Sequence, residues 1–307
     1  MSSRGVHLRS NQDQATPAIC DYEGSEYRTE FWEGQGREYE DAVERIALGA
    51  LIPPTGRRLV DLGAGFGRLA DLYAGYQQVV LLDYSRSMME DARRRLGDDP
   101  RFTYVVGNLY DLPFADGAFD TSVMVRVIHH LAEPGTAIAE IRRTLSSDSR
   151  LVLEYANKRN VKAILRYLWR RQPDNPFGRE PYEFVPLNYD FHPRFIEGLL
   201  DAAGLAVQAE RCVSAFRQPW LKTHVPARWL ATLDGLLQVP TAPLKWTPSV
   251  FLRAKTSGEA VPLAPSLFRC PECHGVDLRP GEAALTCQGC GRLWSAREGI
   301  HDFKTPL

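Results

Sequence analysis

Short apolar runs alternate with helix-compatible stretches along the first half of the chain. The runs lie at residues 59–62, 78–83, 102–106, 119–125 and 150–156, and each has the length of a buried strand. Strands that alternate with helices usually pair as a parallel sheet with helices on both faces. The pattern therefore predicts an α/β fold with a doubly wound, Rossmann-like sheet.

Further elements are expected on either side of this alternation. Helices are expected at residues 42–50, 195–203 and 229–237, and strands at residues 205–211 and 250–254. With these two late strands, the expected sheet is seven-stranded and mostly parallel.

The first apolar run passes directly into three glycines. Residues 59–68 read LVDLGAGFGR, with Gly63, Gly65 and Gly67 at alternate positions, and a helix-compatible stretch follows. A strand, a tight turn and a helix in this order direct backbone N–H groups at a ligand over the strand end. The third glycine stands one residue too early for the G-x-G-x-x-G dinucleotide fingerprint. The turn alone is also compatible with another nucleotide-binding or structural role.

Polar residues follow at the ends of the next two runs. Asp83 ends the second run, roughly 20 residues after the glycines, where a carboxylate accepts hydrogen bonds from two ribose hydroxyls. Asn108 and Leu109 follow the third run.

In their order and spacing, these motifs resemble the type 11 domain of class I S-adenosylmethionine-dependent methyltransferases, over about residues 40–156. The resemblance implies S-adenosyl-L-methionine as cofactor and an antiparallel hairpin of the two late strands at the sheet edge. It also implies a polar side chain facing the adenine amino group, although Asp is commoner there than the Asn108 of this chain. The cofactor-binding residues are then expected to be Asp61, Gly63, Ala64, Gly65, Gly67, Asp83, Tyr84, Asn108, Leu109 and Arg126.

The segment after the fourth run bears on the methyl acceptor. Residues 126–129 read RVIH instead of the N-P-P-Y tetrapeptide of some amine methyltransferases, which argues against adenine-N6 and glutamine methylation. His129 or His130 is a candidate general base, because imidazole titrates near neutrality. Alternatively, one histidine packs and orients the loop. Weaker candidates are Tyr182, Tyr189 and His192.

The segments before and after this core leave alternatives open. Residues 1–20 are expected to be disordered. Trp32 and Tyr39 are expected to be packing aromatics. The alternative is a cofactor contact, in which Arg37 or Tyr27 reaches the methionine carboxylate of S-adenosyl-L-methionine.

Residues 158–193 form an insertion that begins with a basic amphipathic helix. It is interpreted as a packed helix with solvated charges, as a lid over an anionic or amphipathic substrate, or as a membrane- or RNA-docking helix.

The end of the chain carries two C-x-x-C pairs. Cys270 and Cys273 precede Cys287 and Cys290, a spacing that predicts a tetrahedral structural zinc site. Residues 256–266 have linker composition, so the methyltransferase domain is expected at 21–255 and a small zinc-ribbon domain at 267–307. The ribbon resembles the small activator proteins that partner RNA and protein methyltransferases.

Composition narrows the functional classes. The formal net charge is −1, so no global field attracts nucleic acid or an anionic membrane. No membrane span or signal peptide is expected, and the cysteine usage fits a reducing cytoplasm. We expect a small-molecule methyltransferase. An RNA or protein methyltransferase is the alternative, and a cofactor-binding scaffold is a third class. The oligomeric state stays open.

Overall fold

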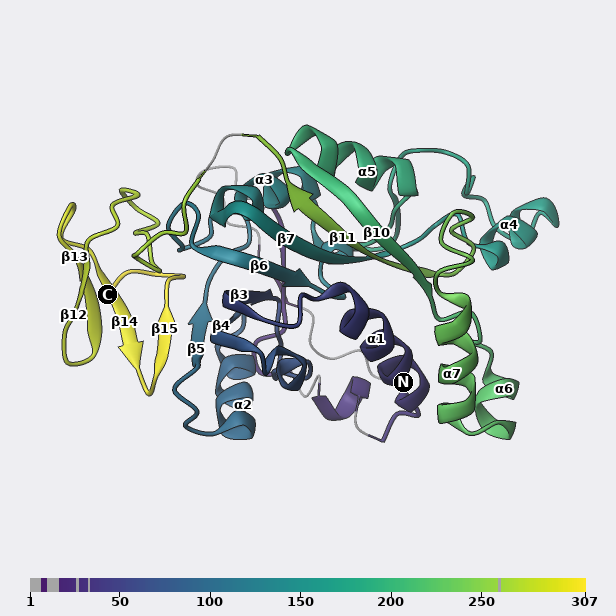
Figure 1. Cartoon of the computed structure of the whole chain (residues 1–307), viewed down its shortest axis with the longest axis horizontal. Coiled ribbons are helices and arrows are strands. Elements are labelled where there is room, and N and C mark those ends of the chain that lie inside the picture. Colours follow the sequence, from purple (N-terminus) through teal and green to yellow (C-terminus); the bar gives the residue numbers. More distant parts are fainter. Residues whose placement is uncertain (1–6, 10–16, 26–27, 33, 259–260) are drawn as a thin grey trace.

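The computed structural model describes residues 7–9, 17–25, 28–32, 34–258 and 261–307 (Figure 1). Its centre is a sheet with strand order β10-β11-β7-β6-β3-β4-β5-β15-β14-β13-β12. The first seven strands in this order have the bounds β10 Leu205–Val213, β11 Ser249–Thr256, β7 Leu145–Ala156, β6 Phe119–Met124, β3 Gly56–Leu62, β4 Tyr76–Asp83 and β5 Phe102–Val106. Strands β3 to β7 pair in parallel, and β10 and β11 form the antiparallel edge.

The expectation of seven strands was wrong, because the C-terminal segment continues the same sheet. Its strands are β12 Leu278–Pro280, β13 Ala284–Cys287, β14 Leu293–Arg297 and β15 Ile300–Asp302. β15 pairs in parallel with β5, with Ile300 opposite Tyr104 and Asp302 opposite Val106. The ribbon, residues 267–307, thereby occupies the edge of β5 that would otherwise be exposed, and the sheet has eleven strands.

Helices cover both faces of the sheet (Figure 1). The α-helices are α1 Glu38–Leu51, α2 Arg86–Leu96, α3 Pro134–Thr144, α4 Val161–Leu168, α5 Pro193–Ala202, α6 Pro219–His224 and α7 Ala227–Leu237. Shorter helical turns are η1 Arg28–Trp32, η2 Ala70–Tyr73 and η3 Ile128–His130. Side chains of α1, α2 and α7 belong to one buried cluster, and those of α3 and α5 belong to the other.

Strand residues alternate between these two clusters. In β4, Val79 and Leu81 pack toward α1 and α2, whereas Val80 and Leu82 pack on the opposite face. Full burial on both faces explains why the strands read as continuous apolar runs.

The ribbon shares one of these cores with the rest of the chain. Phe268 lies over Phe114 with 6.2 Å between ring centroids, and it also contacts Phe303 at 5.1 Å. The backbone N–H of Phe303 donates to the carbonyl of Val106 at 2.8 Å. The ribbon is therefore packed on the central sheet rather than tethered beside it.

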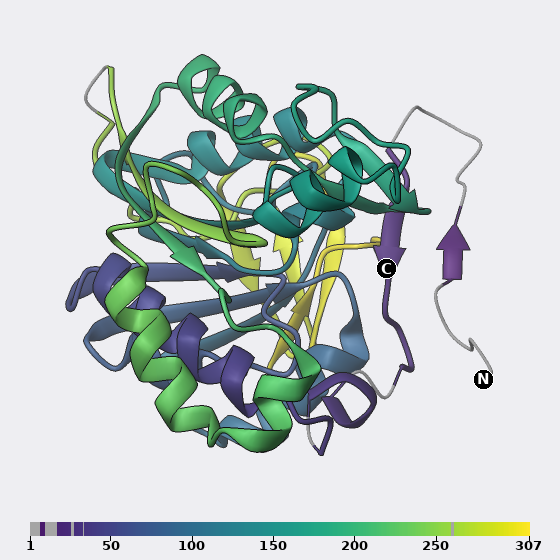
Figure 2. The same cartoon turned by 90° about the vertical axis from the view of Figure 1, so that its right-hand side faces the viewer.

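Within residues 1–20, which were expected to be disordered, the structure describes residues 7–9 and 17–20. β1 His7–Arg9 pairs with β2 Ile19–Asp21, and both strands are visible in Figure 2. The insertion at 158–193 contains α4 and a hairpin of β8 Tyr182–Val185 with β9 Asn188–Asp190. Within the described residues, no helix has the length and apolar character needed to cross a membrane.

Candidate functional site

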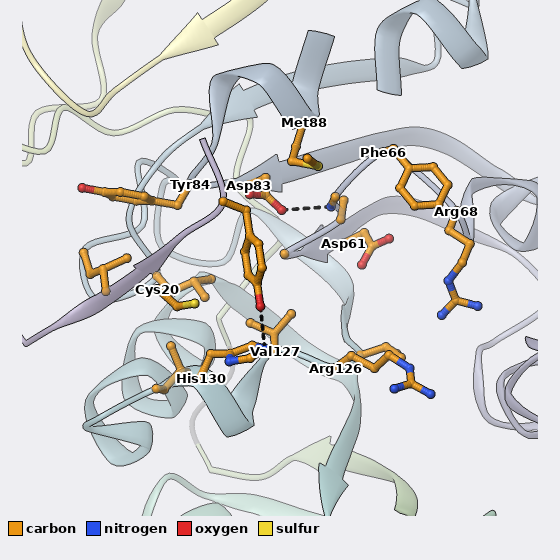
Figure 3. Close-up of a pocket in the computed structure, with 18 of the residues that line it drawn as sticks. Cys20, Asp61, Phe66, Arg68, Asp83, Tyr84, Met88, Arg126, Val127 and His130 are labelled. Carbon is orange, nitrogen blue, oxygen red and sulfur yellow. Dashed lines mark hydrogen bonds between the residues drawn. The ribbon is translucent and has the colours of Figure 1, made fainter. Parts of the chain in front are cut away.

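A pocket opens at the carboxyl ends of the parallel strands, where ligands of open α/β sheets bind (Figure 3). All the predicted cofactor residues except Gly67 line it: Asp61, Gly63, Ala64, Gly65, Asp83, Tyr84, Asn108, Leu109 and Arg126. The empty space, with the solvent at its mouth, is about 1010 Å³. Sequence motifs separated by many residues thus meet around one cavity.

The surroundings of the three glycines explain in different ways why a side chain is absent at each position. All three have positive φ, at 73°, 53° and 72° for Gly63, Gly65 and Gly67. A Cβ on Gly63 would lie 2.2 Å from a methyl group of Val127, whereas a Cβ on Gly65 would meet nothing within 4 Å. A Cβ on Gly67 would lie 3.1 Å from Leu96 of α2, so Gly67 serves packing. Gly65 is therefore the glycine that keeps space open for a ligand.

The carboxylate of Asp83 is held against the glycine turn. Its two oxygens accept hydrogen bonds from the backbone N–H groups of Gly65 at 2.9 Å and Ser85 at 3.0 Å. Figure 3 marks the first of these bonds. Burial raises the pKa of Asp83 above its ordinary value, against the lowering effect of these donors. The turn and the end of β4 are thus fixed relative to each other.

Asp61 lies deeper in the same pocket. Burial raises the pKa of Asp61 to about 7, although the hydroxyl of Tyr73 donates to it at 2.8 Å. This carboxyl group therefore titrates near neutral pH.

One wall of the pocket is a buried ionic cluster that the sequence motifs do not reveal. Glu44 of α1 accepts hydrogen bonds from Arg68 at 2.7 Å and from Arg126 at 2.8 Å. Both guanidinium groups also face the ring of Trp32, with centroid distances of 3.8 and 5.1 Å. Burial by itself would raise the pKa of Glu44, but Arg126 and Arg68 hold it below its ordinary value. Glu44 is therefore ionised in the folded protein.

The two candidate histidines have different environments. The Nδ1 atom of His130 lies 3.0 Å from the carbonyl oxygen of Leu187, so Nδ1 carries the proton and Nε2 accepts. The hydroxyl of Tyr22 donates to Nε2 at 3.3 Å, and His130 lines the pocket (Figure 3). Burial lowers the pKa of His130. Its accepting nitrogen therefore faces the cavity in neutral form.

His129 does not line the pocket. Its Nδ1 atom is buried and has no hydrogen-bond partner among the described residues, and burial lowers its pKa well below the ordinary value. The rings of His129 and His130 pack with 4.1 Å between centroids. The geometry thus distinguishes two residues that the sequence left equivalent.

The opposite rim comes from the N-terminal segment that was expected to be disordered. Ile19 and Cys20 of β2, followed by Tyr22, line the pocket. The ribbon reaches this rim as well, because the Lys304 ammonium lies 3.9 Å from the ring centroid of Tyr84. No motif in the sequence marks this strand.

Other residues considered from the sequence lie elsewhere. Tyr39 is buried and donates to Asp234 of α7 at 2.7 Å, which confirms its packing role. Trp32 is also buried, but it lines the pocket as well. The Arg37 guanidinium lies over Phe31 at 3.6 Å, outside the pocket lining. Tyr27 falls outside the described residues. The weaker catalytic candidates Tyr182, Tyr189 and His192 do not line the pocket.

The four ribbon cysteines form a second candidate site. The sulfur atoms of Cys270, Cys273, Cys287 and Cys290 all lie within 4.8 Å of one another. Two of the pairs are 3.8 and 3.5 Å apart. Thiolates at about 2.3 Å from one tetrahedral zinc ion are roughly 3.8 Å apart, so the donor set fits this metal. His274, next to Cys273, is not part of the cluster.

Comparison with known proteins identifies the central segment. Residues 60–153 match a protein family described as a methyltransferase domain. This segment is similar to methyltransferase domains. It contains the glycine turn, Asp83, Asn108, His129 and the pocket residue His130.

Relatives of this segment include methyltransferases of two names. The chain is 37% identical over 115 residues to a demethylmenaquinone methyltransferase of Clavibacter sepedonicus, covering 37% of this chain and 47% of that protein. It is 30% identical over 151 residues to the O-methyltransferase resE of Aspergillus sclerotiorum, covering 46% and 57%. The chain thus spans about half the length of the curated relatives it matches.

Among solved structures, an S-adenosylmethionine-dependent methyltransferase of Mesorhizobium loti has the same fold. Its TM-score is 0.53 at 19% identity, with 70% of this chain and 99% of that chain covered.

The burial of His130 leads to a titration prediction. We expect the pKa of His130 to lie below the ordinary value of about 6.5. The pKa is measured by NMR, and the His130 signal is assigned by its loss in His130→Gln. Because the unfolded chain then binds a proton more readily, the free energy of unfolding should decrease as the pH falls below about 6.5.

Tyr22→Phe removes a donor to the neutral imidazole and should raise the pKa of His130, whereas Tyr182→Phe should not. An unchanged pKa in Tyr22→Phe would contradict the assigned tautomer.

Proposed function

We propose that this chain transfers a methyl group from S-adenosyl-L-methionine to a small-molecule acceptor. The proposal rests on one observation above the others. The glycine turn, Asp83, the Asn108–Leu109 loop and the accepting nitrogen of His130 surround a single cavity within a methyltransferase domain.

In this proposal, different pocket residues bind different parts of the cofactor. Asp83 accepts from the ribose hydroxyls, and Asn108 and Leu109 contact the adenine. The open space above Gly65 accommodates the chain that leads to the sulfonium. When bound, the cofactor supplies an activated methyl group for an in-line displacement, so the protein mainly positions the acceptor and removes its proton.

His130 is the residue we assign to proton removal. Its Nε2 atom accepts a hydrogen bond from the Tyr22 hydroxyl, so an acceptor hydroxyl at that position would donate in the same way. The names of the relatives, demethylmenaquinone methyltransferase and O-methyltransferase, favour an acidic ring carbon or a hydroxyl as the acceptor. Burial lowers the pKa of His130, which keeps it unprotonated at neutral pH.

The alternative is an RNA or protein acceptor bound through the ribbon. β15 of the ribbon is already paired with β5, and Phe268 and Phe303 are packed against the core. The β15 edge of the ribbon is thus occupied by its own chain, although β12 at the other edge ends the sheet. The shared core favours a structural role for the ribbon.

Substitution at Gly65 tests the cofactor pocket. Gly65→Arg places a long side chain in the cavity and should weaken S-adenosylmethionine binding about a hundredfold or more, measured by calorimetry. Gly97→Arg is the matched control, since Gly97 also has positive φ and open space but lies outside the pocket. Equal loss in both variants would show that the effect is on folding.

Methyl transfer itself is tested with labelled cofactor. A panel of quinols and phenols should include an acceptor, and His130→Gln should lower kcat by about 10²–10⁴-fold with unchanged cofactor affinity. His224→Gln, at an exposed histidine of α6, should retain activity. Labelling of RNA or protein without labelling of the panel would support the alternative.

We further propose that the four ribbon cysteines hold a structural zinc ion. With all four positions occupied by thiolates, the metal has no open position for substrate. Cys270 and Cys287 belong to the same buried cluster as Phe114, so metal binding stabilises the shared core.

Removal of one thiolate tests the metal. Cys287→Ser should lower the zinc content from about one ion per chain, measured by elemental analysis, and should lower the urea midpoint of unfolding. Cys20→Ser, at a thiol outside the cluster, should keep the metal. Full zinc content in Cys287→Ser would exclude the site.

A further inference from the structure

Four of the six tryptophans of this protein are exposed. Trp169, Trp220, Trp229 and Trp246 are 62, 66, 58 and 49% exposed, whereas Trp32 and Trp294 are buried. Single exposed apolar residues are ordinary, but a cluster of large ones marks an interaction surface.

The exposed tryptophans lie on α6, on α7, in the loop after α7 and at the end of α4. The carbonyl oxygen of Trp246 accepts a hydrogen bond from the N–H of Val161 at 2.9 Å, so the loop after α7 contacts the start of α4. Exposed aliphatic side chains accompany the tryptophans on α4, on α7 and in this loop. We call the whole set the apolar face: Val161, Leu165, Leu168, Trp169, Trp220, Trp229, Leu233, Leu236, Leu237, Val239, Leu244 and Trp246.

The apolar face lies on the same side of the sheet as the pocket. α4 follows β7, and α6 and α7 follow β10, which runs in the same direction as β7 because each is antiparallel to β11. Both segments therefore begin at the carboxyl ends of the strands. Figure 2 views this side, with α4, α6 and α7 toward the viewer, and the ribbon lies at the far end of the molecule.

Positive charge accompanies the apolar face, mainly along α4. Residues 157–171 contain six basic residues and no acidic residue. Lys158 is buried near Asp174, which leaves five at the surface: Arg159, Lys162, Arg166, Arg170 and Arg171. The Arg171 guanidinium lies 5.7 Å from the Trp169 ring, and that of Arg228 lies 5.8 Å from Trp229. Cations therefore accompany Trp169 at the end of α4 and Trp229 of α7.

We propose that the apolar face docks on an anionic lipid surface. Exposed indoles and leucines enter the headgroup boundary of a bilayer, and nearby Lys and Arg side chains pair with anionic lipids. A second copy of this chain would bring like charges together. A nucleic acid would pair with the arginines but would leave Leu168 and Leu236 uncovered. An anionic lipid surface would contact both the basic side chains and the apolar side chains of this face.

Docking in this orientation turns the carboxyl ends of the strands toward the bilayer. An amphipathic acceptor dissolved in the membrane would then approach the pocket side of the protein. The docking surface itself does not depend on the proposed methyl transfer, and the binding test below uses neither cofactor nor acceptor.

The test measures binding of the full zinc-loaded chain to vesicles. Vesicles of phosphatidylcholine alone are compared with an equimolar mixture of phosphatidylcholine and phosphatidylglycerol by co-sedimentation and tryptophan emission. We expect binding to the anionic vesicles with a blue shift of emission, and weaker binding as salt is raised. Absence of binding, or equal binding to RNA and to vesicles, would overturn the proposal.

Paired variants locate the surface. Arg166→Gln/Arg170→Gln/Arg171→Gln and Leu168→Ser/Trp169→Ser should each reduce binding about tenfold or more. Controls on α2 and the ribbon are Arg94→Gln/Arg279→Gln/Arg292→Gln and Leu307→Ser, at similarly exposed positions, which should bind as the wild type does. Equal loss in the control variants, or a dimer in solution that Leu168→Ser/Trp169→Ser abolishes, would assign the face to another role.

Discussion

The buried carboxylate of Glu44 joins three segments that are distant in sequence. It lies in α1 and accepts from Arg68, at the end of the glycine turn, and from Arg126, just after β6. A buried ion pair adds little stability in itself, but losing one partner leaves an uncompensated charge that costs about 3–5 kcal/mol. The position of α1, the turn and the end of β6 are therefore coupled, and Trp32 completes this wall by lying against both guanidinium groups.

The central sheet and most of the pocket follow from local sequence, because each depends on short-range signals. Apolar runs predict β3 to β7, and the order of the motifs places Asp83 and Asn108 at neighbouring strand ends. The eleven-stranded sheet could not be predicted in the same way. Pairing of β15 with β5 joins residues almost 200 positions apart. The three residues of β15 do not indicate in sequence which strand they pair with.

The choice between His129 and His130 shows the same limit. Adjacent histidines are equivalent in sequence, and the difference comes from the carbonyl of Leu187 in the insertion, which fixes the proton on Nδ1 of His130. Leu187 itself has positive φ, at 54°, at the turn between β8 and β9. Likewise, Gly67 fits the glycine motif but serves contact with α2, and only the packing around each glycine separates that role from that of Gly65.

The ribbon and the pocket are connected through the loop after β5. Asn108 begins this loop at the pocket, and Asp111 lies 3.3 Å from Arg269 of the ribbon. The N–H of Arg269 also donates to the carbonyl of Pro113 at 3.0 Å. Since the same few residues contact the cavity on one side and the ribbon on the other, loss of ribbon packing would free the loop that carries Asn108. The cysteine cluster therefore contributes to the order of the pocket as well as to the stability of the ribbon.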